Sequence, residues 1–323
     1  MRNVFFFCFV LFSLHSCKKN ELNADVEQIN LATDLRLNKI KFLNPQIGFA
    51  VGGDLYARPL LYKTMDGGKI WSDISTLLQA EQKEIFSLDI SAKGELITAG
   101  YGGTMYYSKD TGKSFNYIQH PSWEALQDIC FLNKDTALWV IGVNLKKGLM
   151  GYLDANNLSV SSTLDSRSFE LSDIDVVSEQ DVYMSGYGAV LRSADKGQHW
   201  DFTTAKNDYF KSMSWQDKDH GIAIGYGGSI CKTNDGGNTW EVIRNGNALF
   251  QKKKHWLCVE NNGLGTYIVV GEQGECMLSR NEGKSWEAMS EFTKEDLRGL
   301  FFSDVNTCFV VGTHGYLAKL RID

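Results

Sequence analysis

The sequence predicts an all-β fold made of seven similar units. Three observations indicate this class: apolar residues alternate with polar ones at period two, turn signals separate the apolar runs, and this combination recurs along the chain. Residues 296–320 show it well, because their alternating pattern breaks at SD and at GTHG and resumes after each break. The chain has 31 glycines and only 3 prolines, which is typical of many strands joined by tight turns.

A glycine that follows an apolar strand marks each unit. About four short strands fit between successive glycines, and units of that length form propeller blades, in which each sheet packs on two neighbours. The 3.6-residue periodicity that a helical solenoid requires does not occur. We therefore expect seven four-stranded antiparallel blades across residues 25–323. The marking glycines are Gly52, Gly100, Gly142, Gly186, Gly225, Gly271 and Gly312.

Closure of the ring requires a strand from elsewhere in the chain, because the last unit ends at Asp323 without an outermost strand. The segment 25–32 precedes the first unit and has apolar side chains at Val26, Ile29 and Leu31. We expect this segment to complete the seventh blade, so that the N-terminal and C-terminal strands share one sheet and no sheet edge is left open.

A turn pattern, S/T-x-D-x-G-x-x-W, occurs five times between the third and fourth strands of a unit. The acid can accept hydrogen bonds from backbone amides of its own turn, and the glycine can adopt a positive φ. We expect the aromatic residue to cover the gap between neighbouring sheets, so the pattern is structural. The acid positions are Asp66, Asp110, Asp195 and Asp235, with Asn281 in the last copy, and the aromatic positions are Trp71, Phe115, Trp200, Trp240 and Trp286.

The pattern resembles the Asp-box, or BNR repeat, of sialidases, sortilin-type receptors, xyloglucan-cleaving glycosidases and the photosystem II stability and assembly factor propellers. The resemblance covers nearly all of residues 25–323 and is closest to the assembly-factor group. It implies a propeller whose boxes lie away from the binding face. It also implies a non-catalytic role as a protein-binding or assembly-scaffold module, with an unidentified envelope protein or peptide as partner.

The expected binding face is the one opposite the boxes, where the turns between second and third strands lie. These turns place Tyr101, Tyr187 and Tyr226 at equivalent positions, with Glu272 and His314 in later units. Tyrosine rings there can stack a sugar or a peptide side chain, or they can simply fill tight turns.

The residues just before the inner strands point to the same face. Lys211, His255 and Arg298 give the last three units adjacent cations, while Asp128 and Asp173 follow one position later in two earlier units. Such a rim can hold an acidic segment of a partner through charge-assisted hydrogen bonds. The alternative is an ordinary solvated charged surface.

An alternative function is carbohydrate binding or sialidase-like glycan cleavage. That chemistry needs three arginines for the substrate carboxylate, a tyrosine with a glutamate partner and an acid, and only Arg58 in YARP faintly matches. If the chain is an enzyme, it is a glycoside hydrolase. We expect no metal, because the histidines are scattered, and no cofactor, because the glycine-rich turns join strand to strand.

The first residues predict a lipoprotein signal. Arg2 precedes the apolar run 4–14, and LHSC ends at Cys17, so we expect a signal peptide over 1–16, lipidation of Cys17, and a short linker over 17–24. The residue after the cysteine is Lys18, which resembles lipoproteins sent to the outer membrane. The resemblance implies that the protein is located in the envelope of a Gram-negative-type bacterium, as an outer-membrane lipoprotein that faces the periplasm or the cell surface.

Charge and cysteine content limit the other properties of the chain. The net charge of −6 gives no attraction for nucleic acid or anionic lipid, and we expect a monomer held at the membrane by its lipid alone. Five cysteines remain after the signal, none with close spacing, so we expect buried thiols rather than a disulfide framework. These are Cys130, Cys231, Cys258, Cys276 and Cys308.

Overall fold

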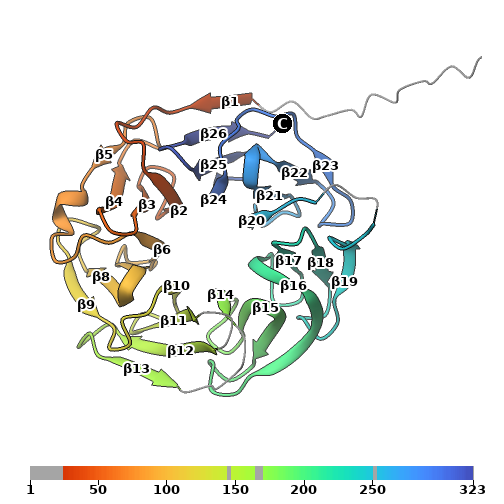
Figure 1. Cartoon of the computed structure of the whole chain (residues 1–323), viewed down its shortest axis with the longest axis horizontal. Coiled ribbons are helices and arrows are strands. Elements are labelled where there is room, and N and C mark those ends of the chain that lie inside the picture. Colours follow the sequence, from red (N-terminus) through yellow and green to blue (C-terminus); the bar gives the residue numbers. More distant parts are fainter. Residues whose placement is uncertain (1–24, 144–146, 164–169, 250–252, 323) are drawn as a thin grey trace, which may run out of the picture.

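The computed structural model is a closed ring of antiparallel sheets (Figure 1). It describes residues 25–143, 147–163, 170–249 and 253–322. The predicted signal peptide, linker and Cys17 lie outside these ranges. No helix within them is long and apolar enough to span a bilayer.

The first half of the ring holds three four-stranded sheets. The first contains β2 (Arg36–Phe42), β3 (Gly48–Asp54), β4 (Arg58–Thr64) and β5 (Ser72–Asp73), followed by the 3-10 helix η1 (Ser75–Leu77). The second contains β6 (Ile85–Ile90), β7 (Leu96–Gly100), η2 (Tyr101–Gly103), β8 (Thr104–Ser108) and β9 (Asn116–Gln119). The third contains β10 (Leu126–Phe131), β11 (Thr136–Val143), β12 (Lys147–Asp154) and β13 (Val160–Thr163).

The second half holds a larger sheet and two further four-stranded ones. The larger sheet contains β14 (Leu171–Val176), β15 (Val182–Ser193), β16 (Asp201–Trp215), β17 (Gly221–Gly225), β18 (Ile230–Thr233) and β19 (Glu241–Arg244). The next contains β20 (Trp256–Asn261), β21 (Tyr267–Gly271), η3 (Glu272–Gly274), β22 (Cys276–Ser279) and β23 (Glu287–Ala288). The last contains β24 (Leu297–Asp304), β25 (Thr307–Gly312), β26 (Leu317–Arg321) and β1 (Asp25–Gln28).

The predicted all-β propeller of four-stranded antiparallel blades is confirmed, but the described residues form six hydrogen-bonded sheets where the sequence predicted seven. The difference arises at β16, which pairs with β15 through residues 201–209 and with β17 through residues 210–215. Because this strand continues from one predicted unit into the next, two units share one six-stranded sheet.

The N-terminal strand closes the ring as predicted. β1 pairs antiparallel with β26, and Val26 lies opposite Leu320. Val26 packs against the apolar cluster of the last sheet, while Ile29 and Leu31 pack against the cluster between the last sheet and the first. Figure 1 shows β1 on the outside of β26, so the last sheet contains strands from both ends of the chain.

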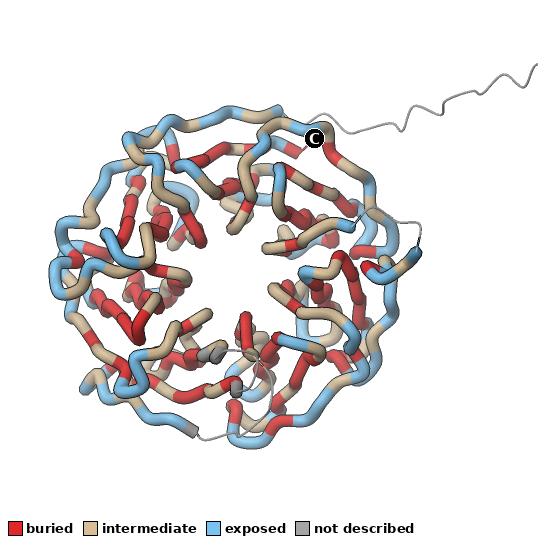
Figure 2. Tube along the Cα trace, viewed as in Figure 1, coloured by how far each residue is buried: buried red, intermediate tan, exposed pale blue. Residues whose placement is uncertain are grey.

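Apolar side chains between neighbouring sheets hold the ring together. Figure 2 shows buried residues concentrated within the sheets and exposed ones around the outer edge. Between the last sheet and the first, the ring of Phe309 stacks on that of Phe42 with centroids 4.7 Å apart. The tryptophan of the first box, Trp71, packs edge-on against Phe309 at 6.4 Å. In this box the aromatic residue lies at the gap between two sheets.

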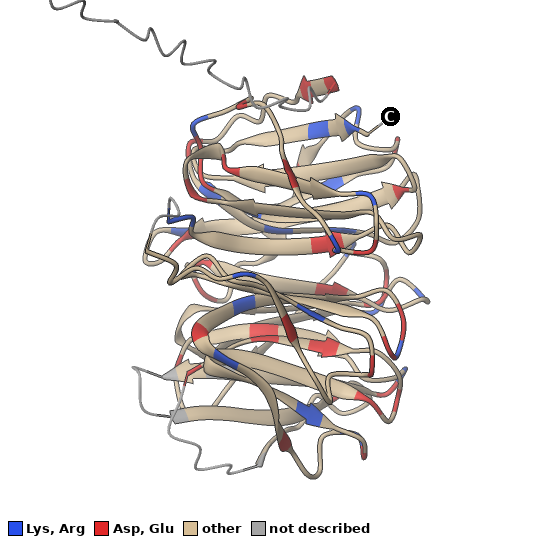
Figure 3. Ribbon diagram, turned by 90° about the vertical axis from the view of Figure 1, so that its right-hand side faces the viewer, with Lys and Arg blue, Asp and Glu red and all other residues tan. Residues whose placement is uncertain are grey.

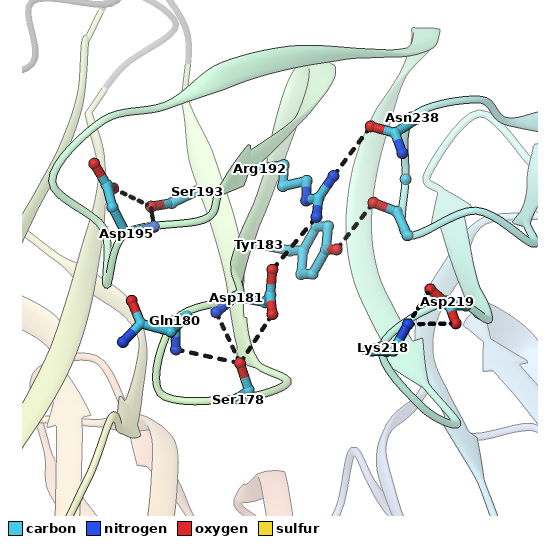
Figure 4. Close-up of polar contacts among 12 residues, drawn as sticks. Ser178, Gln180, Asp181, Tyr183, Arg192, Ser193, Asp195, Lys218, Asp219 and Asn238 are labelled. Atoms are coloured by element: carbon cyan, nitrogen blue, oxygen red, sulfur yellow. Dashed lines mark hydrogen bonds and ion pairs between the residues drawn. The ribbon is translucent and has the colours of Figure 1, made fainter.

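The Asp boxes form hydrogen-bonded turns. Asp195 Oδ1 accepts a hydrogen bond from the hydroxyl of Ser193 at 2.8 Å (Figure 4). It also accepts one from the backbone N–H of His199 at 2.8 Å. These hydrogen bonds lower the pKa of Asp195 to about 2, and the bond from the His199 backbone has the largest effect. In the last box Asn281 Oδ1 accepts the equivalent bonds, from Ser285 N at 2.9 Å and Ser279 Oγ at 3.0 Å, so an amide replaces the acid there.

Further polar contacts join the two halves of the six-stranded sheet near a box. Tyr183 donates to the carbonyl of Gly236 at 2.9 Å, and Arg192 donates to Asn238 at 3.0 Å and pairs with Asp181 at 3.4 Å (Figure 4). These residues therefore hold one repeat against the next, which agrees with a structural role for this end of the ring.

The five cysteines within the described ranges are free thiols. Burial raises the pKa of Cys231 and Cys276 to about 12, which suppresses the reactive thiolate. Cys231, Cys276 and Cys308 are buried free thiols, whereas Cys130 and Cys258 are free thiols that are only partly buried.

Candidate binding site at the channel mouth

A pocket of about 340 Å³ lies at the centre of the ring, where the inner strands begin. Each inner strand has a β-bulge there, which inserts one extra residue and turns a side chain toward the pocket. Because each box follows the third strand of its unit, the boxes lie at the opposite end of the ring. The bulge residues lining the pocket are Asn38, Phe86, Gln127, Ser172, Lys211, Leu257 and Arg298.

Arg298 lies in a chain of polar contacts across the mouth. Its Nε donates to Asn38 Oδ1 at 2.7 Å, and the amide of Asn38 donates to Glu84 at 2.7 Å. Glu84 is fully buried and pairs with Arg36 at 2.6 Å. The charge of Arg36 is therefore balanced by Glu84. Arg298 contacts this network only through the neutral side-chain amide of Asn38.

Lys211 lies on the other side of the mouth, beside a tyrosine. Its Nζ is 3.4 Å from the hydroxyl of Tyr209, which in turn donates to Glu170 at 2.8 Å. Burial and the negative charge of Glu170 raise the pKa of Tyr209, so the hydroxyl stays protonated. Among the described residues, no carboxylate forms an ion pair with Lys211 or Arg298.

Lys211 and Arg298 are therefore the cations of the mouth that form no ion pair within the described ranges. Acidic side chains nearby, Glu170 and Asp173 for Lys211 and Glu84, Asp296 and Glu272 for Arg298, still favour their charged forms. Burial lowers the pKa of Arg298, and repulsion from Arg36 lowers it further. Burial also lowers the pKa of Lys211, and the charge of Arg298 adds to this effect, although Glu170 opposes it. Charged residues of both signs occur across the rest of the molecule (Figure 3). An anionic group entering the pocket would relieve the repulsion among these cations.

The structure separates His255 from the other two predicted cations. Trp256 is the residue that pairs with Gly271, so the bulge residue of β20 is Leu257 and the mouth has an apolar side chain at this position. His255 lies two residues earlier, with Nδ1 2.8 Å from the carbonyl oxygen of Tyr226. The predicted alignment of the inner strands was wrong at this position by two residues.

The other predicted residues form separate small groups around the rim. His255 packs on the ring of Tyr226, with centroids 4.4 Å apart, and Tyr226 donates to Glu272 at 2.7 Å. His314 contacts none of these and instead pairs with Glu295 at 2.6 Å, a hydrogen bond that raises the pKa of His314.

Of the two remaining tyrosines, Tyr187 is exposed and Tyr101 is half-buried. Tyr187 is 55% exposed, with its ring 6.1 Å from that of Tyr209. The hydroxyl of Tyr101 is 3.0 Å from that of Tyr56, which sequence reasoning missed. Tyr56 lies in the turn equivalent to that of Tyr101, but the first repeat has DLYAR there instead of GYGG, so position within the repeat was its one signal.

Asp128 and Asp173 line the mouth pocket from inside the ring. Asp128 is 3% exposed and accepts hydrogen bonds from Lys39 Nζ at 2.8 Å and from the backbone N–H of Ile174 at 3.1 Å. Asp173 accepts from the backbone N–H of Met213 at 2.7 Å. Each carboxylate therefore ties its own inner strand to the next, which is a structural role.

Acidic side chains outnumber cations further along the axis. A second pocket of about 310 Å³ is lined by two cations, Lys39 and Lys41, and by four acids, which are Asp89, Asp175, Asp217 and Glu260. Burial and the nearby charge of Glu260 raise the pKa of Asp175 to about 8, and burial raises the pKa of Glu260 to about 7. Within the described ranges, no group of three or more His, Cys, Asp or Glu side chains is arranged to hold a metal ion.

These raised pKa values predict that the protein loses stability as pH increases. Asp175 and Glu260 bind protons more tightly in the folded state, so their contribution is complete below about pH 4 and is lost as pH rises to about 8. For each of these two groups, the free energy of unfolding falls by at most about 1.4 kcal/mol per pH unit. Urea unfolding at pH 6, 7 and 8 should show a falling free energy, and Asp175→Asn should flatten the decline between pH 7 and 8. An equal slope in both proteins would contradict the assignment to Asp175.

The repeated boxes, the closed ring and the polar central pocket define the chain as a BNR-type β-propeller. Residues 203–291 match the family model described as photosynthesis system II assembly factor YCF48. Together with the structural similarities, this match shows that the chain resembles the photosystem II assembly factor family. No curated protein sequence is significantly similar to the chain.

Solved propellers superpose on almost the whole chain. The structure "YCF48 bound to D1 peptide" has a TM-score of 0.73 at 16% identity, covering 92% of this chain and 97% of that one. YCF48 from Cyanidioschyzon merolae has a TM-score of 0.72 at 17% identity, covering 92% and 98%. The WD40 repeats of RRP9 have a TM-score of 0.75 at 9% identity, covering 93% and 98%. At these identities the similarity establishes the fold.

Proposed function

We propose that this chain is a non-catalytic propeller that binds an extended acidic segment of a partner protein at the channel mouth. The observation that carries the proposal is that two of the cations lining the pocket, Lys211 and Arg298, form no ion pair with a carboxylate among the described residues. The similar propeller solved as "YCF48 bound to D1 peptide" supports a peptide as the class of ligand.

We further propose that the ring has seven repeats and is anchored by lipid at Cys17 on the outer membrane of a bacterial envelope. The repeat number is supported by the seven bulge residues around the pocket, one for each repeat. Two of them lie in the six-stranded sheet, which therefore corresponds to two blades. The anchor is supported by the residue pattern of 2–18. Mass measurement of the mature N-terminus tests the anchor, and an unmodified Cys17 would contradict it.

Removing both pocket cations should abolish most of the binding of an acidic peptide. We expect Lys211→Gln/Arg298→Gln to weaken binding of fluorescein-labelled GEGEGEG at least about tenfold, which corresponds to about 1.4 kcal/mol. Fluorescence anisotropy at low salt measures this, because screening weakens such contacts. The glutamine counterpart, GQGQGQG, should bind neither protein.

A charge-matched control keeps this experiment specific. Lys113→Gln/Arg280→Gln removes the same two charges from exposed box turns at the opposite end of the ring. This control should bind GEGEGEG as the parent protein does. If it loses as much affinity as the mouth variant, the peptide is responding to overall charge and the proposed site is wrong.

A further inference from the structure

Exposed aromatic side chains lie beside the mouth on the same face of the ring. Tyr56 lies in the turn between β3 and β4 and is 74% exposed. Trp123 lies in the loop between β9 and β10 and is 60% exposed. Tyr101 begins η2, in the turn equivalent to that of Tyr56. We refer to Tyr56, Tyr101 and Trp123 as the aromatic patch.

Contacts between these residues make the patch one surface. The rings of Tyr56 and Tyr101 meet edge to face with centroids 5.3 Å apart. Lys83 Nζ lies 5.1 Å from the ring centroid of Trp123, and a Cβ on Gly102 would lie 3.0 Å from the same Nζ. The lysine therefore links the tryptophan to the turn that carries Tyr101.

The patch is continuous with the mouth. Leu55, the residue before Tyr56, lines the mouth pocket together with Arg298. A ligand leaving the pocket over Leu55 therefore reaches the ring of Tyr56 next.

The loop holds Trp123 in a conformation that non-glycine residues rarely adopt, with φ at 58°. The backbone N–H of Trp123 donates to the carbonyl of His120 at 3.2 Å, and that of Glu124 donates to Ser122 Oγ at 3.3 Å. His120 is buried and stacks edge-on against Trp139 at 4.4 Å, which anchors the loop. Backbone strain that keeps a large apolar ring in water is typical of a binding surface.

We propose that the aromatic patch binds an apolar or aromatic side chain of the same acidic segment that the mouth holds, which rests on the proposed function above. Tryptophan and tyrosine close to arginine are the residue types that dominate protein-binding surfaces. A neutral sugar would leave the mouth cations unused, whereas an acidic peptide with one aromatic residue uses both. The partner is therefore a peptide segment with an acidic group and an aromatic side chain a few residues apart.

Labelled peptides that differ only in one side chain test the patch. A series derived from GEGEGEG carries one phenylalanine placed two to six residues beyond the last glutamate, and a matched series carries serine there. Trp123→Gly removes the indole and keeps the loop, because glycine adopts a positive φ without strain. Ile70→Ala, at an exposed apolar side chain in the first box, is the control.

We expect the best phenylalanine peptide to bind the parent protein at least fivefold more tightly than its serine partner. Trp123→Gly should remove that difference and leave serine-peptide binding unchanged, while Ile70→Ala should change neither. Equal binding of the two series to the parent protein at every spacing overturns the inference. So does an equal loss for both peptides in Trp123→Gly, or glycan-array binding that depends on Trp123 without any phenylalanine effect.

The mouth variant separates this inference from the proposed function. Lys211→Gln/Arg298→Gln should weaken both peptide series, because both contain the glutamates. If it weakens neither while the phenylalanine effect persists, the patch binds aromatic side chains independently of the mouth. The proposed function would then be wrong, and so would the claim that one segment occupies both places.

Discussion

Deletion of residues 25–33 should lower the melting temperature of the protein by roughly 10–20 °C. The deletion removes the four paired residues of β1 and the apolar contacts of Val26, Ile29 and Leu31. Backbone hydrogen bonds contribute about 1 kcal/mol each and the apolar contacts add to this, so the loss is about 5 kcal/mol. In a ring of this size each kcal/mol shifts the midpoint by roughly 2–4 °C.

Calorimetry on matched truncations measures this effect. A protein that begins at Asp25 should melt as a protein that begins at Cys17 does, since β1 is intact in both. The protein that begins at Asp34 should melt earlier and should self-associate through the exposed edge of β26. An unchanged melting temperature after the longer deletion would mean that the ring does not depend on this closure.

Replacing Lys39 with methionine should destabilise the protein by about 3 kcal/mol at pH 7. Lys39 pairs with Asp128 at 2.8 Å and also lies near Asp173 and Asp175. Burial opposes the charge of Lys39, but these carboxylates outweigh it and raise the pKa of Lys39. Without the ammonium, Asp128 becomes a buried charge without an ionic partner.

A double-variant cycle separates this pair from simple loss of packing. Lys39→Met/Asp128→Asn should recover at least half of the free energy of unfolding that Lys39→Met loses. The reason is that Asp128→Asn removes the unpaired charge but retains a side chain that accepts hydrogen bonds. Urea unfolding of both single variants and the double variant gives the coupling. Losses that simply add, or a cost below about 1 kcal/mol for Lys39→Met, would contradict the role assigned to Lys39.

The repeating features of the fold were predictable because they depend on local chemistry. Each box needs only an acceptor, a glycine and an aromatic residue at fixed spacing, so Asp195 and Trp71 could be assigned from sequence. The closing strand was predictable because a sheet edge must be paired. The joining of two repeats at β16 was not predictable, because the strand continues through residues 206–210, where KNDYF contains turn-forming residues.

The binding site was predicted less well because it depends on features that do not repeat. The bulge decides which side chain enters the pocket, and a bulge leaves no mark in the sequence, so His255 was chosen in place of Leu257. For the same reason Asp128 was expected on the rim and lies inside the ring. Trp123 was missed because its loop has no equivalent in the other repeats and its exposure depends on the buried anchor His120.

The location of a bound acidic peptide is the most direct test of the division of the ring into a binding end and a structural end. A GEGEGEG peptide with a terminal benzophenone, cross-linked by light and mapped by mass spectrometry, gives that location. We predict cross-links to residues around the mouth, such as Asn38, Lys211 and Arg298, and none to the box turns. Cross-links concentrated at Asp66, Asp195 or Asp235 would contradict it.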